Sequence, residues 1–99
     1  MIRHIVLFRL RASDPMERRA QFEMLANTLR PLAETIEGIH SFRVDADPRP
    51  ENPHWDAALV SEHESWEALA AYQVHPAHVD ALSVVSTICA QKAIVDYEL

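Results

Sequence analysis

Hydrophobic and polar residues alternate at the start of the chain, which predicts a β-strand over residues 2–11. One face of this strand carries Ile2, His4, Val6, Phe8 and Leu10, and the other carries Arg3, Ile5, Leu7, Arg9 and Arg11. Both faces are apolar in the middle, so neither is expected to meet water there. Similar patterns predict further strands over residues 39–45, 55–63 and 92–98.

Between the first two strands, apolar residues recur at a spacing of three and four, which predicts a helix. The stripe consists of Phe22, Leu25, Leu29, Leu32 and Ile36. Asp14 is the expected N-cap and Pro15 the first helical residue. Pro31 should kink the helix or end its regular part near Arg30. Gly38, the only glycine, suits the left-handed residue that follows a helix.

The second half of the chain predicts a proline-rich loop over residues 46–54 and two more helices. Ser65 is a plausible N-cap for a helix over residues 66–74. A second helix over residues 76–89 should begin with Pro76 in its first turn. The resulting order is β-α-β-β-α-β, typical of a ferredoxin-like α+β fold in one domain, residues 1–99.

This fold packs its helices on one face of a four-stranded antiparallel sheet. The opposite face would leave apolar side chains of the first strand in water in a monomer. Pairing two such sheets face to face would cover both, so the sequence predicts a homodimer with a two-fold axis.

Composition excludes several classes of partner. The net charge of −6, without a basic run, argues against nucleic-acid binding, since a phosphate backbone needs a positive surface. Apolar runs such as residues 5–8 are too short to cross a membrane, and the start of the chain has no secretory pattern. We therefore expect a cytoplasmic protein. The single cysteine, Cys89, excludes an internal disulfide and is expected to be buried.

Groups that can move protons near neutral pH cluster in residues 72–78. This segment contains Tyr72, His75 and His78, with Pro76 among them. Because proline lacks an amide donor and disfavours a helical residue before it, one helix should end and another begin at His75. The corner would present all three side chains around one concavity.

These residues also carry a resemblance to a known family. The opening 2–9, the helix 64–72, the corner 72–78 and the ending 95–98 resemble the stress-responsive α/β barrel (Dabb) family of the dimeric α+β barrel superfamily. The resemblance covers essentially the whole chain and implies a ferredoxin-like fold that dimerises into a barrel. The chain departs from the family pattern at His63, where members often have an aromatic residue, and at Asp45, where many have a Gly-x-Asn ending of the second strand. Ala26 stands where one branch of the family has an aromatic pocket residue.

The corner is similar to that of one branch of the family, the plant polyketide cyclases of the olivetolic acid type. The resemblance implies that Tyr72 and His78 are catalytic and that His4 belongs to the pocket. His78 could take a proton from a carbon beside a carbonyl, and Tyr72 could stabilise the enolate oxygen. Enolisation, aldol cyclisation or isomerisation would then need no cofactor. The expected substrate-binding residues are His4, Val6, Phe8, Phe22, Leu59 and His75.

A non-catalytic protein with a structural, stress-response or partner-binding role is the alternative. In that case His75 caps the corner, His4 is a satisfied buried histidine, and Tyr72 is a core residue with its hydroxyl at the edge. A cavity bordered by His4, Tyr72 and His78 would favour the enzyme that binds a small apolar carbonyl compound. Filled packing at that place would favour the structural role.

A metal site is a further alternative. His75 and His78, with Asp80 or His4, could supply nitrogen and oxygen ligands. However, Pro76 interrupts the helical ladder that would hold the two histidines on one face, so we expect no metal. His54 and His63, near the ends of predicted segments, are expected to be solvated.

Overall fold

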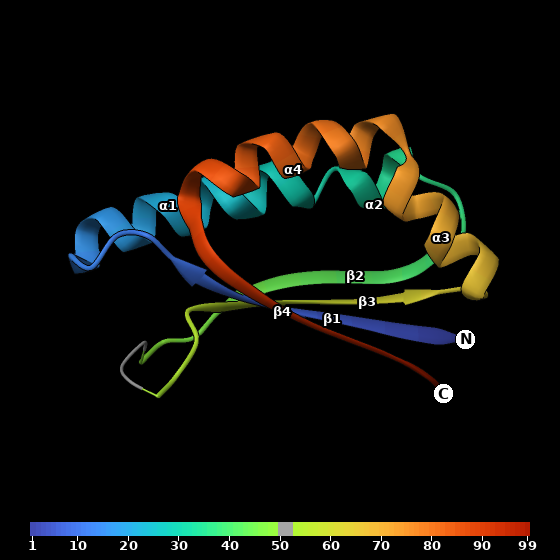
Figure 1. Ribbon diagram of the computed structural model, residues 1–99, viewed down its shortest axis with the longest axis horizontal. Helices are drawn as coiled ribbons and strands as arrows, with labels where there is room; N and C mark the ends of the chain where they lie inside the picture. The colour runs from blue at the N-terminus through green and yellow to red at the C-terminus, as the bar shows by residue number, and fades with distance from the viewer. Residues whose placement is uncertain (50–52) are drawn as a thin grey trace.

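The structure, a computed structural model, describes residues 1–49 and 53–99. Its sheet contains β1 (Ile2–Leu10), β2 (Ile39–Ala46), β3 (Ala57–His63) and β4 (Cys89–Glu98) in the order β2-β3-β1-β4. Each neighbouring pair is antiparallel. The helices form one layer above a single face of the sheet (Figure 1). The predicted ferredoxin-like α+β fold is confirmed.

Proline residues divide each helical region into two helices. The first region contains α1 (Pro15–Leu29) and α2 (Leu32–Thr35), which are separated at Pro31 as the sequence predicts. The second contains α3 (Trp66–Val74) and α4 (Pro76–Ile88). The predicted N-caps are also present, because the side chains of Asp14 and Ser65 accept hydrogen bonds from backbone amides of α1 and α3.

Two strands begin elsewhere than predicted. β3 begins at Ala57 rather than Trp55. The side-chain carboxylate of Asp56 accepts a hydrogen bond from the backbone amide of Leu10, at a point where the backbone hydrogen bonds between β1 and β3 would otherwise continue. β4 begins at Cys89, directly after α4, and pairs there with Leu10 of β1. Residues 50–52 of the predicted 46–54 loop lie outside the described residues.

The hydrophobic core lies between the helices and the sheet. It includes the alternate residues Ile2, Val6, Phe8 and Leu10 of β1, which face the helices. The stripe predicted for the first helical region is buried at Leu25, Leu29, Leu32 and Ile36, and Phe22 packs against its edge. Cys89 is buried as expected, and burial raises the pKa of its thiol to about 11.

Gly38 connects the first helical region to β2 in a conformation that other residues rarely adopt. Its φ angle is 84°, in the left-handed region. A Cβ at this position would lie 3.0 Å from the Cβ of Ala68 in α3. The glycine is therefore required by both the backbone turn and the close approach of α3.

The face of the sheet without helices is apolar in the middle and charged around it. Its apolar side chains are Ile5 and Leu7 of β1, Ala58 and Val60 of β3, and Ala93, Val95 and Tyr97 of β4. We call this set the bare face. Val95 and Tyr97 are more than one-third exposed. The pairs Arg3–Glu62 and Arg43–Asp45 border it.

Candidate active site at the α3–α4 corner

The corner between α3 and α4 is built by His75 and Pro76. His75 is extended, with φ −61° and ψ 136°, and Pro76 is the first residue of α4. The Nδ1 atom of His75 accepts a hydrogen bond from the amide of Ala77 at 3.0 Å. His75 therefore caps α4 with its side chain. This geometry turns His78 back toward Tyr72, and their ring centroids lie 4.5 Å apart.

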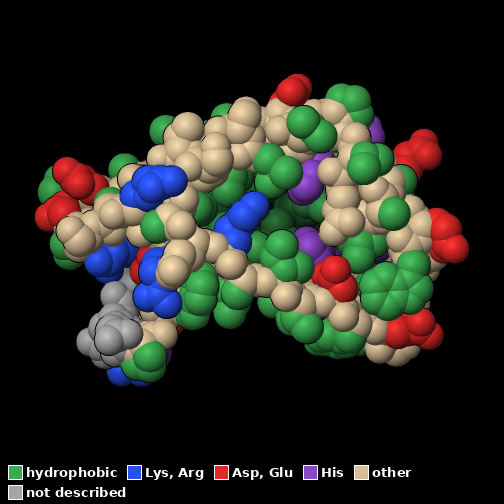
Figure 2. Space-filling view, viewed as in Figure 1, with side chains coloured by type: hydrophobic (Ala, Val, Ile, Leu, Met, Phe, Trp, Pro, Cys, Tyr) green, Lys and Arg blue, Asp and Glu red, His purple; other side chains and the backbone are tan. Residues whose placement is uncertain are grey.

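A cavity of about 260 Å³ lies between the sheet and the helices at this corner. It is lined by His4, Val6, Phe8, Leu29, Leu59, Tyr72, Gln73, His78, Leu82, Val85, Lys92 and Ile94. In Figure 2, histidine, hydrophobic and basic side chains surround the hollow between the helices and the strands. The cavity thus combines an apolar lining with a few polar groups, as small-molecule sites do.

The structure brings six of the eight predicted site residues to this cavity: His4, Val6, Phe8, Leu59, Tyr72 and His78. The other two do not line it. Phe22 lies at a different pocket beside the start of α1, because its position on the helix is two turns before Leu29, which lines the cavity. His75 directs its Nδ1 to the backbone of α4 instead.

The surroundings of His78 favour its neutral form. Its Nδ1 lies 3.0 Å from the carbonyl oxygen of Gln73. Because a carbonyl can only accept, Nδ1 carries the hydrogen and Nε2 keeps its lone pair. Burial lowers the pKa of His78, and the positive charges of His4 and Lys92 lower it further, against the opposing effect of the Gln73 hydrogen bond.

Burial keeps the phenol of Tyr72 in its protonated form. The residue is only 1% exposed. Four other rings surround its ring, those of His4, Phe42, His63 and His78, with centroids 4.5 to 6.3 Å away. Burial raises the pKa of the phenol well above its usual value, so the hydroxyl remains protonated at neutral pH.

His4 is fixed by the last strand of the sheet. Its Nδ1 lies 2.5 Å from Oδ1 of Asp96, which is its partner across the β1–β4 ladder. The carboxylate therefore orients the imidazole, with Nδ1 as the donor and Nε2 as the remaining nitrogen. Sequence reasoning missed Asp96, although the alternation of β4 places it on the same face as Lys92 and Ile94.

His63 is buried, and the expectation that it is solvated is wrong. It is 0% exposed, and its Nε2 lies 2.8 Å from Oγ of the equally buried Ser61. Among the described residues its Nδ1 has no hydrogen-bond partner. Burial, together with the charge of His4, lowers the pKa of His63 to about 4. The sequence pattern that indicates this burial is the alternation of β3, which places His63 on the same face as Leu59 and Ser61.

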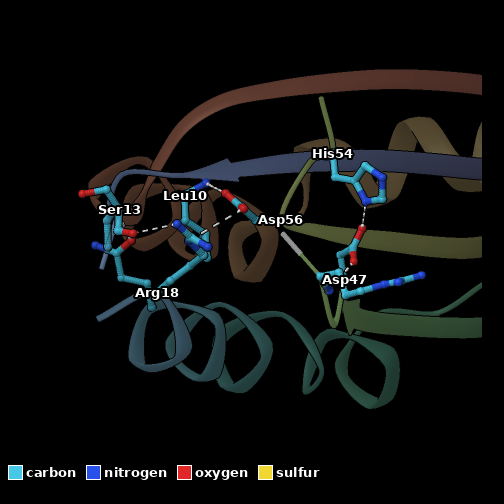
Figure 3. Close-up of polar contacts among 9 residues, drawn as sticks. Leu10, Ser13, Arg18, Asp47, His54 and Asp56 are labelled. Atoms are coloured by element: carbon cyan, nitrogen blue, oxygen red, sulfur yellow. Dashed lines mark hydrogen bonds and ion pairs between the residues drawn. The ribbon is translucent and has the colours of Figure 1, made fainter. Parts of the chain in front are cut away.

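A second pocket, of about 350 Å³, lies at the opposite end of the sheet. Figure 3 shows that two of its polar side chains, those of Asp56 and Arg18, are directed at one another. Oδ2 of Asp56 accepts from the amide of Leu10 at 2.7 Å, and Oδ1 lies 3.9 Å from Nε of Arg18. Arg18 also donates to the carbonyl of Ser13 at 2.7 Å. We interpret this cluster as a structural link between β1, α1 and β3.

His54, also shown in Figure 3, is about half exposed and lies 2.9 Å from Asp47. Within residues 1–49 and 53–99, no group of three or more His, Cys, Asp or Glu side chains is arranged to hold a metal. No helix in the same ranges has the length and apolar character needed to span a membrane.

Comparison with protein families gives one match over almost the whole chain. The family described as Stress responsive A/B Barrel Domain (Dabb) matches residues 2–99. The chain belongs to the Dabb family. The resemblance seen in the sequence is therefore confirmed. A search of the curated proteins found no match for this Dabb protein.

Solved structures similar to this Dabb protein share its fold. A dimeric protein of unknown function with a ferredoxin-like fold, from Bacteroides fragilis, is 30% identical, with a TM-score of 0.86 over 99% of this chain and 95% of that one. A dimeric ferredoxin-like protein of unknown function from Thermobifida fusca is 28% identical, with a TM-score of 0.83 and coverage of 99% and 90%.

One similar structure is an enzyme. A hydroxynitrile lyase from Passiflora edulis is 15% identical, with a TM-score of 0.81 over 99% of this chain and 92% of that one. At this identity the likeness concerns the fold alone, because one fold can support unrelated chemistries.

Proposed function

We propose that this Dabb protein is a homodimeric enzyme that binds a small carbonyl compound and transfers a proton on it without a cofactor. The observation that supports this function is the cavity bordered by His4, Tyr72 and His78. A purely structural role for the corner would be served by filled packing at this place. Instead the corner leaves room for a ligand beside its two proton-transferring groups.

In the proposed reaction, Nε2 of His78 removes a proton from the carbon next to the carbonyl. The electron pair of the broken C–H bond forms the C=C bond of the enolate, and the carbonyl oxygen becomes negative. The Tyr72 hydroxyl donates a hydrogen bond to that oxygen. The lowered pKa of His78 and the raised pKa of Tyr72 favour this division of roles, because one is neutral and the other protonated at pH 7.

The enolate then has two outcomes that need no further reagent. If the carbonyl compound is β,γ-unsaturated, the enolate is a dienolate, and return of the proton from His78 to its γ-carbon gives the α,β-unsaturated isomer. Attack of the enolate carbon on a second carbonyl of the same molecule gives an aldol ring, and the proton moves to the new alkoxide. His4, oriented by Asp96, lines the cavity and can position either substrate through Nε2.

The homodimer is supported by the bare face of the sheet. Exposed apolar surface of this kind marks an association site. The Bacteroides fragilis and Thermobifida fusca proteins, which share the fold, are both described as dimeric. Pairing of two bare faces would leave the cavity of each protomer accessible, because the cavity lies on the helical side of the sheet.

Hydrogen exchange at carbon tests the proposed chemistry directly. The protein would be incubated with 2-nonanone in D₂O, and loss of the α-proton signals would be followed by NMR. We expect exchange above the buffer rate, with a decrease of about 10² to 10⁴ in His78→Ala and Tyr72→Phe. His40→Ala, at an exposed histidine of β2, is the matched control. Exchange no faster than in buffer, or equal in all variants, would contradict the proposal and favour a non-catalytic role.

A further inference from the structure

Lys92 is the only lysine of the chain, and it lines the cavity. It lies on β4 opposite Phe8 of β1, on the face of the sheet that the helices cover. The residue is exposed, which places its ammonium group at the mouth of the cavity rather than in its interior. A cation at the entrance of a mostly apolar cavity is a feature that the proposed proton transfer does not use.

The charges around Lys92 leave its ammonium without an internal counterion. Among the residues that the structure describes, Lys92 takes part in no ion pair or hydrogen bond. The nearest carboxylate on the same face of β4 is that of Asp96, which is engaged with His4. The facing helix α4 contributes His78, which is neutral, and the adjacent Cys89 thiol is protonated, with a pKa raised to about 11.

We propose that the ligand of this cavity is an oxo acid whose single carboxylate binds Lys92 while its carbonyl lies at Tyr72 and His78. The inference rests on the proposed function, because it adds the substrate class to the same site. Lys92 is the only lysine or arginine of the lining, and without such an anion its ammonium remains unpaired. One ammonium matches a carboxylate better than a dianionic phosphate, which usually requires several donors.

The register of the sheet indicates how far Lys92 lies from His4, whose ring centroid is 6.1 Å from that of Tyr72. His4 faces Asp96, Val6 faces Ile94 and Phe8 faces Lys92 across the β1–β4 ladder. His4 and Lys92 are thus offset by four residues, roughly 13 Å along the strands. Val6 and Ile94 supply apolar surface between them. The carboxylate and the carbonyl should therefore be separated by several methylene groups.

Calorimetric binding of three related probes tests this inference. The probes are 7-oxooctanoate, its methyl ester, and the shorter 4-oxopentanoate. We expect the wild-type protein to bind 7-oxooctanoate about fivefold to tenfold more tightly than its ester, since one ion pair at the cavity mouth is lost. The shorter acid should bind more weakly than the longer one, because it cannot reach both ends of the site.

Variants test whether Lys92 causes the tighter binding of 7-oxooctanoate than of its methyl ester. Lys92→Met should remove the preference for the acid over the ester, and Lys92→Arg should retain it. Arg19→Met, which removes an equal charge from an exposed position outside the cavity, should have no effect on it. Far-ultraviolet circular dichroism of each variant would establish that it is folded.

The outcomes separate this inference from the proposed function. Equal binding of the acid and the ester to the wild-type protein would overturn the role of Lys92, while exchange on 2-nonanone would still support proton transfer. A preference that persists in Lys92→Met would also overturn it. Failure of all three probes to bind, together with no exchange on 2-nonanone, would reject both proposals. Tighter binding of octyl phosphate than of 7-oxooctanoate would overturn the assignment of a carboxylate, because it would show that the anionic group at Lys92 is a phosphate.

Discussion

The imidazole of His4 and the carboxylate of Asp96 lie 2.5 Å apart, Nδ1 to Oδ1, and connect the first strand of the sheet to the last. We predict that Asp96→Ala lowers the free energy of unfolding by about 1 to 3 kcal/mol, because it leaves a buried Nδ1 without its partner. Urea denaturation would measure the change. Asp80→Ala, at an exposed position of α4, should change stability by less than about 0.5 kcal/mol. Equal effects of the two substitutions would contradict the prediction.

The acid side of the pH profile should report on His78. Because burial lowers the pKa of this imidazole, its neutral form persists to lower pH than that of an ordinary histidine, near 6.5. The midpoint of the acid-side decrease in the rate of exchange on 2-nonanone should therefore lie below pH 6.5. NMR titration of the His78 ring proton would give the same midpoint. A midpoint above 6.5 would disprove the lowered pKa.

His63 should make the protein sensitive to acid. Its pKa is about 4 in the folded state and about 6.5 in the unfolded state, so the unfolded chain binds the proton more tightly. The stability that depends on neutral His63 is fully present above pH 6.5 and is lost as the pH falls from 6.5 toward 4. Its contribution is about 2 to 3 kcal/mol. Urea denaturation at several pH values would measure it.

The control for this prediction compares two variants with the wild-type protein. The quantity compared is the slope of the free energy of unfolding against pH. His63→Phe keeps a ring beside Tyr72 but cannot be protonated, so its stability should fall less steeply between pH 6.5 and 4. His40→Gln, at an exposed position, should retain the wild-type slope. Identical slopes in the wild-type protein and His63→Phe would show that His63 does not cause the acid sensitivity.

Gly38 is predicted to be intolerant of a side chain. Gly38→Ala should destabilise the fold by about 1 to 3 kcal/mol, because its φ of 84° is unfavourable for alanine and the new Cβ would lie 3.0 Å from that of Ala68. A double-mutant cycle with Ala68→Gly would separate the two causes. Partial recovery in the double variant would measure the steric part. A neutral Gly38→Ala would contradict both causes.

The bare face should hold two protomers together. Leu7→Lys places a charge in the middle of this face, where a second copy would have to bury it. We expect sedimentation to give a dimer for the wild-type protein and a monomer for the variant at micromolar concentration. Met24→Lys, at a half-exposed position of α1, should remain dimeric. A monomeric wild-type protein would reject the proposed homodimer.

Much of the fold follows from local signals in the sequence. Prolines at positions 31 and 76 and caps at Asp14 and Ser65 set the helix ends, and alternation sets the strands. The start of β3 was missed because the contact between Asp56 and Leu10 joins residues 46 positions apart. No local pattern indicates a contact of this kind.

The sequence predicted the part of the candidate site that lies within one segment, residues 72–78. Tyr72 and His78 are six residues apart, and Pro76 fixes the turn between them. Asp96 and Lys92 were missed because they reach the cavity only through the pairing of β1 with β4. The burial of His63 was missed because the sequence alone indicates a solvent-exposed histidine near the end of a strand. Only the structure shows that α3 covers it.

The alternation of β1 has a consequence for how this protein can vary. Consecutive residues serve two different purposes, since His4 and Val6 line the cavity while Ile5 and Leu7 belong to the bare face. Deletion or insertion of a single residue within this strand would exchange the two sets, sending arginines into the core and the imidazole to the outside. Length changes should therefore be excluded from β1 over evolution, whereas substitutions on either side can accumulate independently.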